Sequence, residues 1–173
     1  VRDAYRSLNS VDSDNLIRIN ADEITYHLHI VVRFEIERAL SNGELEVDEL
    51  PSVWNDKYEQ YLGIRPDSDS KGVLQDIHWY QGSIGYFPTY SLGSILSAQF
   101  YSKADEEIDN LEEKIASGEL QPLRDWLKEN IHQKGCLYKT EELVENVTGE
   151  KPTADFFLDY IEEEFGDIYN IET

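Results

Sequence analysis

Three features of the 173-residue sequence predict a mainly α-helical fold with at most a short β-strand near Arg18. Segments with a helical pattern fill most of the chain, and glycines stand between them. Only the short segment of residues 15–19 has the β-branched composition of an extended strand. Hydrophobic residues make up 40% of the chain, enough for one domain or for a lobe of a larger one.

The first half of the chain predicts two helices. A long one is expected over residues 21–40, because Asn20 lies three residues before Glu23, which is the spacing of a capping box. A shorter one is expected over residues 52–62, with a proline before it and a glycine after it. Residues 64–75 are rich in turn-forming residues and indicate an exposed loop.

The second half opens on an aromatic segment and continues as helices. Residues 76–90 fit neither a helical nor a strand period, yet they are aromatic and nearly uncharged, which indicates an ordered, partly buried turn. A helix is expected from Tyr90 to Ala116, with a break near Gly93. Three more helices are predicted over residues 120–132, 140–147 and 153–165.

The charge balance excludes several classes of function. The chain has 15 basic and 36 acidic residues, a net charge of −21, so it lacks the basic footprint that binds nucleic acid or an anionic membrane. No segment approaches the roughly 20 apolar residues of a membrane span. The single cysteine cannot form an internal disulfide, which favours the cytoplasm. Because the chain starts at Val1 and contains no methionine, we expect an excised segment.

A stripe of polar residues runs along the first long helix. Asp22, Tyr26, His29, Arg33 and Glu37 recur at a spacing that places them on one side, between apolar flanks. Buried charges have to be paired, so the stripe is either a ladder that only positions the helix or the support of a site. The spacing alone favours the ladder, and the two interpretations are compatible.

The histidines do not form a metal-binding pattern. His27 and His29 point in nearly opposite directions on a helix, unlike the two histidines of HExxH, and that motif is absent from this sequence. Asp76 and His78 have no third ligand near them in sequence. We therefore predict no metal site within the chain.

Two further positions have a structural and a functional interpretation. Arg18 either pairs with Asp22 or Glu23, or presents its planar fork to the carboxylate of a ligand. Tyr86 and Tyr90 are either core tyrosines or donors to an oxygen that becomes negative during a reaction. Composition leaves the two alternatives for Arg18 even and, taken alone, favours the core interpretation of the tyrosines.

Two long segments carry a resemblance to a known family. Residues 16–37, LIRINADEITYHLHIVVRFEIE, and residues 76–93, DIHWYQGSIGYFPTYSLG, resemble the two signatures of the carboxypeptidase Taq family. The intervening LPSVWNDKYEQYLGI is also similar, so the resemblance covers essentially all 173 residues. Members have roughly 500 residues, so residues 1–173 are expected to be a single helical C-terminal region of a longer enzyme.

The resemblance implies a helical lobe of a zincin-like metallocarboxypeptidase that removes single residues from peptide C-termini. Its zinc, or another divalent metal, is held by HExxH and a following Glu, all expected upstream of Val1 in the missing part. Arg18 would hold the terminal carboxylate of the substrate, and Tyr90 would stabilise the oxyanion. The supporting positions would be Asp22, Glu23, Tyr26, His29, Arg33, His78 and Tyr86.

The resemblance also implies partners. These are a peptide substrate with a free C-terminus, the missing N-terminal part and a second copy in a homodimer, whereas nucleic acid and membrane are not expected. A different class of function remains as the alternative, namely a non-catalytic helical interaction or regulatory module derived from the same fold. Catalysis by this chain alone is not expected, because the zinc motif is absent from it.

Overall fold

The computed structural model describes residues 2–12 and 14–171, and the chain divides into two compact units. The first unit is Val1–Ser91 and the second is Leu92–Thr173. All regular structure in the described residues is helical, which confirms the predicted fold class. None of these helices is long and apolar enough to cross a bilayer.

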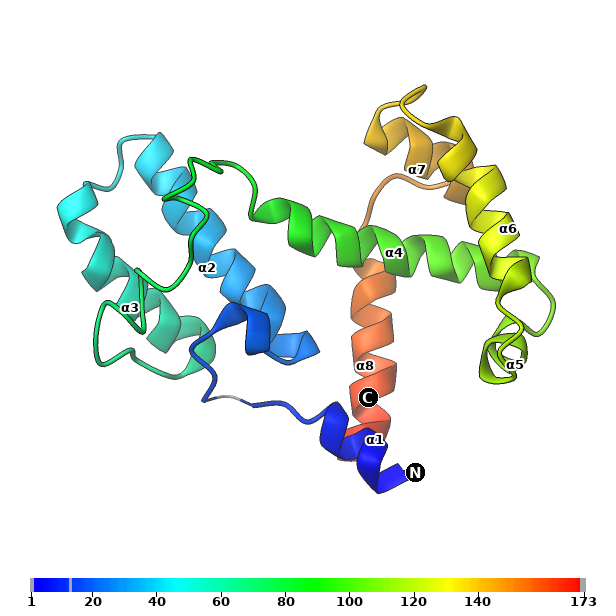
Figure 1. Cartoon of the computed structure of the whole chain (residues 1–173), viewed down its shortest axis with the longest axis horizontal. Helices are drawn as coiled ribbons and strands as arrows, with labels where there is room; N and C mark the ends of the chain where they lie inside the picture. The colour runs from blue at the N-terminus through cyan, green and yellow to red at the C-terminus, as the bar shows by residue number, and fades with distance from the viewer. Residues whose placement is uncertain (1, 13, 172–173) are drawn as a thin grey trace. The chain divides into compact units, whose positions relative to one another are not determined.

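The first unit is built on two helices that pack against each other. Its elements are α1 (Arg2–Leu8), η1 (Arg18–Asn20), α2 (Glu23–Ser41), η2 (Val47–Glu49) and α3 (Leu50–Leu62). Figure 1 shows α2 and α3 side by side, with the segment that follows α3 crossing beside them. Gly63, with φ of 72°, ends α3 in the left-handed conformation, as the sequence predicts.

The start of α2 differs from the prediction. Asp22, rather than Asn20, is the N-cap, and its carboxylate accepts hydrogen bonds from the N–H groups of Ile24 and Thr25 at 3.0 and 2.9 Å. Asn20 belongs instead to the single 3-10 turn η1, which replaces the extended segment expected around Arg18. An Asp at the N-cap satisfies two N–H groups that otherwise lack partners, which fixes the first turn of α2.

The core of the first unit lies between α2 and α3. Trp54 stacks on Tyr58 one helical turn away, with ring centroids 5.0 Å apart. Both side chains are fully enclosed. The buried apolar residues of this core are Val32, Ile36, Trp54, Tyr58, Leu62 and Val73.

The second unit contains the remaining helices. They are α4 (Pro88–Glu107, which begins within the first unit), α5 (Leu111–Ala116), α6 (Gln121–Asn130), η3 (His132–Lys134), α7 (Thr140–Thr148) and α8 (Asp155–Tyr169). The predicted break near Gly93 is wrong, because α4 runs through this residue. The chain breaks instead at residues 108–110, where Asn110 takes the left-handed conformation with φ of 55°.

Buried polar contacts fix the core of the second unit. Ala104, Leu111 and Trp126 form a buried apolar cluster of this unit, and the Nε1–H of Trp126 donates to Glu107 at 2.7 Å. The buried amide of Gln99 donates to the Thr148 hydroxyl at 3.1 Å. It also bonds the main chain of residues 151 and 153, which ties the connection between α7 and α8 to α4.

Candidate functional site

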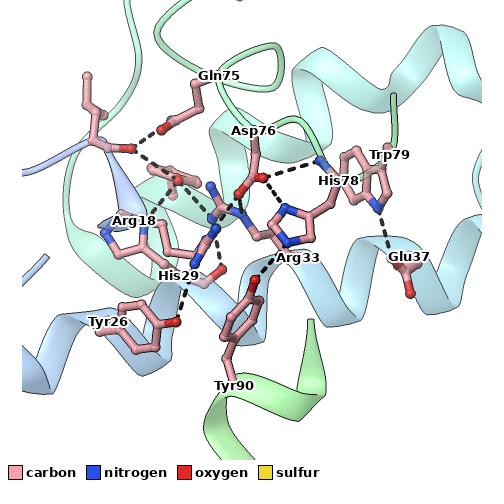
Figure 2. A network of polar contacts seen from close by, with 12 residues as sticks. Arg18, Tyr26, His29, Arg33, Glu37, Gln75, Asp76, His78, Trp79 and Tyr90 are labelled. Atoms are coloured by element: carbon pink, nitrogen blue, oxygen red, sulfur yellow. Dashed lines mark hydrogen bonds and ion pairs between the residues drawn. The ribbon is translucent and has the colours of Figure 1, made fainter. Parts of the chain in front are cut away.

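One carboxylate, that of Asp76, joins three elements of the first unit (Figure 2). Its Oδ2 accepts hydrogen bonds from the Nε of Arg18 at 3.1 Å and the Nε of Arg33 at 2.9 Å. Its Oδ1 lies 2.5 Å from the Nδ1 of His78. The irregular segment after α3 is thereby bound to η1 and α2.

The Asp76 carboxylate is ionised and does not balance the charge around it. Burial alone would raise the pKa of Asp76, but the His78 hydrogen bond and the charges of Arg33 and Arg18 hold this pKa well below its usual range. Two guanidinium groups share one carboxylate, so the Arg18, Arg33 and Asp76 set carries one surplus positive charge. Such a charge in a mostly desolvated place attracts an anionic ligand.

Arg33 is fully enclosed and has a structural role. Its Nη1 donates to the main-chain oxygen of His29 at 2.9 Å and to the hydroxyl of Tyr58 at 3.2 Å. Its guanidinium lies 4.7 Å from the ring centroid of Trp54, a cation–π distance. With all faces occupied by protein, Arg33 holds Asp76 and has no open side for a ligand.

Arg18 lies at the edge of the network and is 7% exposed. Besides Asp76, its Nη1 donates to the Tyr26 hydroxyl at 3.3 Å, and its guanidinium lies 4.8 Å from the ring centroid of Tyr90. Among the described residues, none accepts a hydrogen bond from its Nη2. Of the two alternatives for Arg18, the structure does not show the pairing with Asp22 or Glu23, because its ion pair is formed with Asp76.

Asp22 is occupied elsewhere, which explains why it does not pair with Arg18. Its carboxylate caps α2 and also accepts from the Thr25 hydroxyl at 2.5 Å and the Asp12 N–H at 3.1 Å. These bonds outweigh partial burial and lower the pKa of Asp22. Glu23 is exposed in the first turn of α2.

His29 contacts the network through the hydroxyl of Tyr58. Its Nδ1 lies 3.0 Å from the Tyr58 hydroxyl, which also donates to the main-chain oxygen of Leu16 at 3.3 Å. The Nε2 of Gln75 donates to the same oxygen at 2.7 Å. Burial, together with the charges of Arg33 and Arg18, lowers the pKa of His29 from 6.5 to about 4. This histidine is therefore neutral at physiological pH.

His78 connects Asp76 to Tyr90. Its Nε2 lies 2.9 Å from the Tyr90 hydroxyl, while the Tyr86 ring stacks on it at 5.8 Å. The Phe87 ring packs on it at 4.6 Å, and the His78 side chain is only 14% exposed. Tyr90 lies in the first turn of α4 and is partly buried, whereas Tyr86 is 50% exposed.

Glu37, the last residue of the polar stripe, anchors the aromatic segment. Its buried carboxylate accepts from the Nε1–H of Trp79 at 2.8 Å and from the main-chain N–H of Gly85. Gly85 has φ of 79°, a left-handed conformation that glycine adopts at little cost. Both limbs of the aromatic turn are thus attached to α2.

The structure brings most of the predicted site residues together. Arg18, Tyr26, His29, Arg33, His78 and Tyr90 share one network, and Tyr86 joins it by ring stacking. Sequence reasoning missed the contributions of Tyr58 and Gln75 and treated Asp76 only as a weak metal ligand. The Asp-x-His spacing of residues 76–78 was the one local signal that Asp76 is the centre of this network.

The network offers hydrogen bonds and charge, not a metal centre. No group of three or more His, Cys, Asp or Glu side chains that could hold a metal ion occurs in residues 2–12 and 14–171. The residues of this chain that the structure describes therefore do not fit a metal by themselves. What the site can do is bind an anion at Arg18 and donate or accept a hydrogen bond at Tyr90.

Comparison with known proteins places this arrangement in a family. The profile described as Carboxypeptidase Taq (M32) metallopeptidase matches residues 1–165. Thermostable carboxypeptidase 1 of Thermus thermophilus is 46% identical over 169 residues, covering 98% of this chain and 33% of the relative. Thermostable carboxypeptidase 1 of Pyrococcus furiosus is 45% identical over 163 residues, covering 94% and 32%.

Solved structures agree with this result. The crystal structure of a carboxypeptidase of the same family from Deinococcus radiodurans superimposes with a TM-score of 0.94 at 43% identity, covering 97% of this chain and 34% of that one. The chain thus spans about a third of the length of the relatives it matches. With a family profile that matches nearly the whole sequence, the chain belongs to the carboxypeptidase Taq family of metallopeptidases.

Proposed function

We propose that this chain forms the substrate side of a zinc metallocarboxypeptidase that removes single residues from peptide C-termini. The observation that carries the proposal is the surplus positive charge at Arg18, next to the phenol of Tyr90. A carboxypeptidase has to recognise a free carboxylate and stabilise an oxygen close to it. The two side chains offer these two functions a short distance apart.

Arg18 is the proposed ligand of the terminal carboxylate. Its Nε is fixed by Asp76 and its Nη1 by Tyr26, so the guanidinium plane is oriented before substrate arrives. The remaining N–H groups are on Nη2 and Nη1, which form the end of the fork that binds carboxylates. An oriented fork loses little freedom on binding, which favours tight positioning of the reacting bond.

Tyr90 is the proposed donor to the carbonyl oxygen that becomes negative in the transition state. A phenol donates a hydrogen bond without bringing charge, and a fixed donor in a dry site stabilises a developing negative charge strongly. The hydroxyl of Tyr90 is held by the Nε2 of His78, and its ring lies against Arg18. Asp22, Tyr26, His29, Arg33 and Tyr86 would support this geometry.

The rest of the proposal concerns parts outside the chain. A family of metallopeptidases implies a divalent metal. We propose zinc, held by HExxH and a Glu in an N-terminal part to which residues 1–173 attach as the helical C-terminal region. A homodimer in the cytoplasm is the proposed form of the complete protein.

Replacing Arg18 tests the proposal. In the complete protein, Arg18→Ala should lower kcat/KM on peptides with a free C-terminus by about 10- to 100-fold, because a hydrogen-bonded charge contact contributes about 1.5–3 kcal/mol. Arg18→Lys should restore only part of the loss, since ammonium lacks the fork. The measurement is release of the terminal amino acid.

Arg65→Ala is the matched control, because Arg65 is an exposed arginine paired with Asp56 and Glu59 on the surface of the same unit. Its kinetics should match those of the unchanged protein. If Arg18→Ala folds normally and retains full kcat/KM, Arg18 does not bind the substrate. If the unchanged complete protein releases no amino acid at all, the alternative of a non-catalytic helical module is supported instead.

A further inference from the structure

The hydrogen bonds of His78 determine which of its nitrogens carries a proton. Asp76 is ionised, so its Oδ1 only accepts hydrogen bonds. The Nδ1 of His78, 2.5 Å from Oδ1, must therefore be the N–H donor in this contact. The main-chain N–H of His78 approaches the same oxygen at 3.4 Å. It follows that any loss of a proton from the ring occurs at Nε2.

The state of Nε2 in turn fixes the direction of the Tyr90 hydroxyl. When His78 is neutral, Nε2 is a pure acceptor, so the only way to form the 2.9 Å contact is for Tyr90 to donate its proton to it. The phenol then has no proton left for another acceptor. When His78 is protonated, Nε2–H donates to the phenol oxygen, and the Tyr90 proton is free to turn toward a ligand.

We propose that protonated His78 is the positioning residue that turns the Tyr90 hydroxyl outward as a hydrogen-bond donor. This inference rests on the proposed function, in which Tyr90 stabilises the oxyanion. His78 does not touch the substrate in this scheme. It acts through Tyr90, and the neutral ring switches off the donor without moving any heavy atom.

The surroundings of His78 hold its ring in one place. Asp76 contacts the Nδ1 side of the ring through Oδ1, and Arg18 and Arg33 bind the other oxygen of Asp76. The rings of Tyr86 and Phe87 pack against the imidazole. The titratable and charged groups around it are Asp76 and Tyr86 of the segment before α4, Tyr90 of α4, Arg18 of η1 and Arg33 of α2.

Nitrogen NMR of the complete protein, labelled with ¹⁵N-histidine, tests the proton positions directly. The signals of His78 are assigned as those that His78→Asn removes. As the pH rises, Nε2 should change from a protonated to an unprotonated shift while Nδ1 stays protonated, and Tyr90→Phe should alter the Nε2 shift most. A neutral ring protonated at Nε2, or a ring that stays neutral wherever the protein is active, overturns the inference.

The kinetic test follows the same titration. With a short peptide substrate, kcat should fall as His78 loses its proton, by about 100-fold or more, which is the usual effect of losing one oxyanion donor. Tyr90→Phe should have a low kcat at all pH values and lack this decline. His132→Asn, which removes an exposed histidine of the second unit, should retain the decline unchanged.

The two proposals fail in different ways. Absence of peptidase activity in the complete protein removes the proposed function, whereas the NMR titration still reports whether His78 controls the Tyr90 proton. An active protein whose kcat rises or stays constant as His78 deprotonates contradicts the inference and leaves the proposed function intact. The pH dependence separates the positioning role from a merely structural one. If His78 were only structural, His78→Asn would lower kcat by the same factor at every pH.

Discussion

His29 links the packing of the first unit to pH. It is fully enclosed between α2 and α3 and contacts the Tyr58 hydroxyl at 3.0 Å. Its pKa of about 4 lies below the ordinary 6.5, so the unfolded chain takes up the proton first as the pH falls. The contribution of His29 to stability is therefore complete above pH 6.5 and is lost as the pH falls through about 4.

This shift predicts a measurable pH dependence of unfolding. Between pH 7.5 and 5, His29 should cost the chain about 2 kcal/mol of unfolding free energy. His29→Gln, which does not titrate, should remove that part of the slope in urea unfolding followed by circular dichroism. The exposed His132 provides the control, and His132→Gln should leave the slope as it is. If the dependence of unfolding free energy on pH is unchanged in His29→Gln, other groups cause it.

At the residue scale, sequence reasoning succeeded where contacts are local and failed where they are distant. The stripe on α2 follows from helical geometry alone, and His29, Arg33 and Glu37 are indeed buried. The partner of Arg18 lies 58 positions away in Asp76, and no spacing rule reports such a contact. Pairing with a nearby acid was one of the two alternatives left open for Arg18, and the capping role of Asp22 removes one of those acids.

Among the elements, α2 and the aromatic turn depend on each other through Glu37. Glu37 is 6% exposed, and its carboxylate accepts hydrogen bonds from two N–H groups, those of Trp79 and Gly85. Without this acceptor both donors would lose their hydrogen-bond partner beside the buried Glu37 side chain. The turn carries His78 and leads into Tyr90, so its attachment to α2 sets the geometry of the whole site.

Glu37→Gln should loosen this attachment. An amide accepts only through its oxygen, so one of the two donors then faces an NH2 group and loses its partner. We expect the unfolding free energy to fall by about 1–3 kcal/mol. The substitution should also speed up hydrogen exchange at the Gly85 N–H more than at the N–H groups within α3. Glu44→Gln, in the exposed turn that follows α2, should change neither quantity. Unchanged stability and exchange would show that the Glu37 contacts do not hold the turn.

Helix interiors could be predicted from the sequence more reliably than helix ends. α3 was found with its final glycine, because a left-handed glycine after an apolar helical run is a local signal. The end of α4 was missed, because residues 108–110 contain neither glycine nor proline and the turn depends on Asn110 in a left-handed conformation. Asparagine adopts that conformation more readily than most residues, but nothing in the helical pattern requires it there.

Over the whole molecule, the dominant property is its charge of −21. Repulsion among so many carboxylates opposes the compact state at low ionic strength. Salt shortens the range of that repulsion from about 30 Å at 0.01 M to about 10 Å at 0.1 M. Exposed ion pairs such as Lys71–Asp67 are weakened by the same salt, but each contributes only about 0–1 kcal/mol.

Repulsion should therefore outweigh the exposed pairs, and salt should stabilise the chain. We expect the urea midpoint at pH 7.5 to be higher in 0.2 M than in 0.01 M sodium chloride. Potassium chloride should have the same effect, because the cause is screening and not binding of a particular cation. An unchanged or lower midpoint in salt would show that ion pairs dominate instead.

The contacts of Asp76 limit which substitutions this position can accept during evolution. Four donors meet at its two oxygens, those of Arg18, Arg33 and both N–H groups of His78. A change to Asn removes the charge beside two buried arginines, and a change to Glu lengthens the side chain that these donors hold in position. Substitutions at Asp76 are therefore costly while Arg18 and Arg33 are both present, which favours an order in which an arginine changes first.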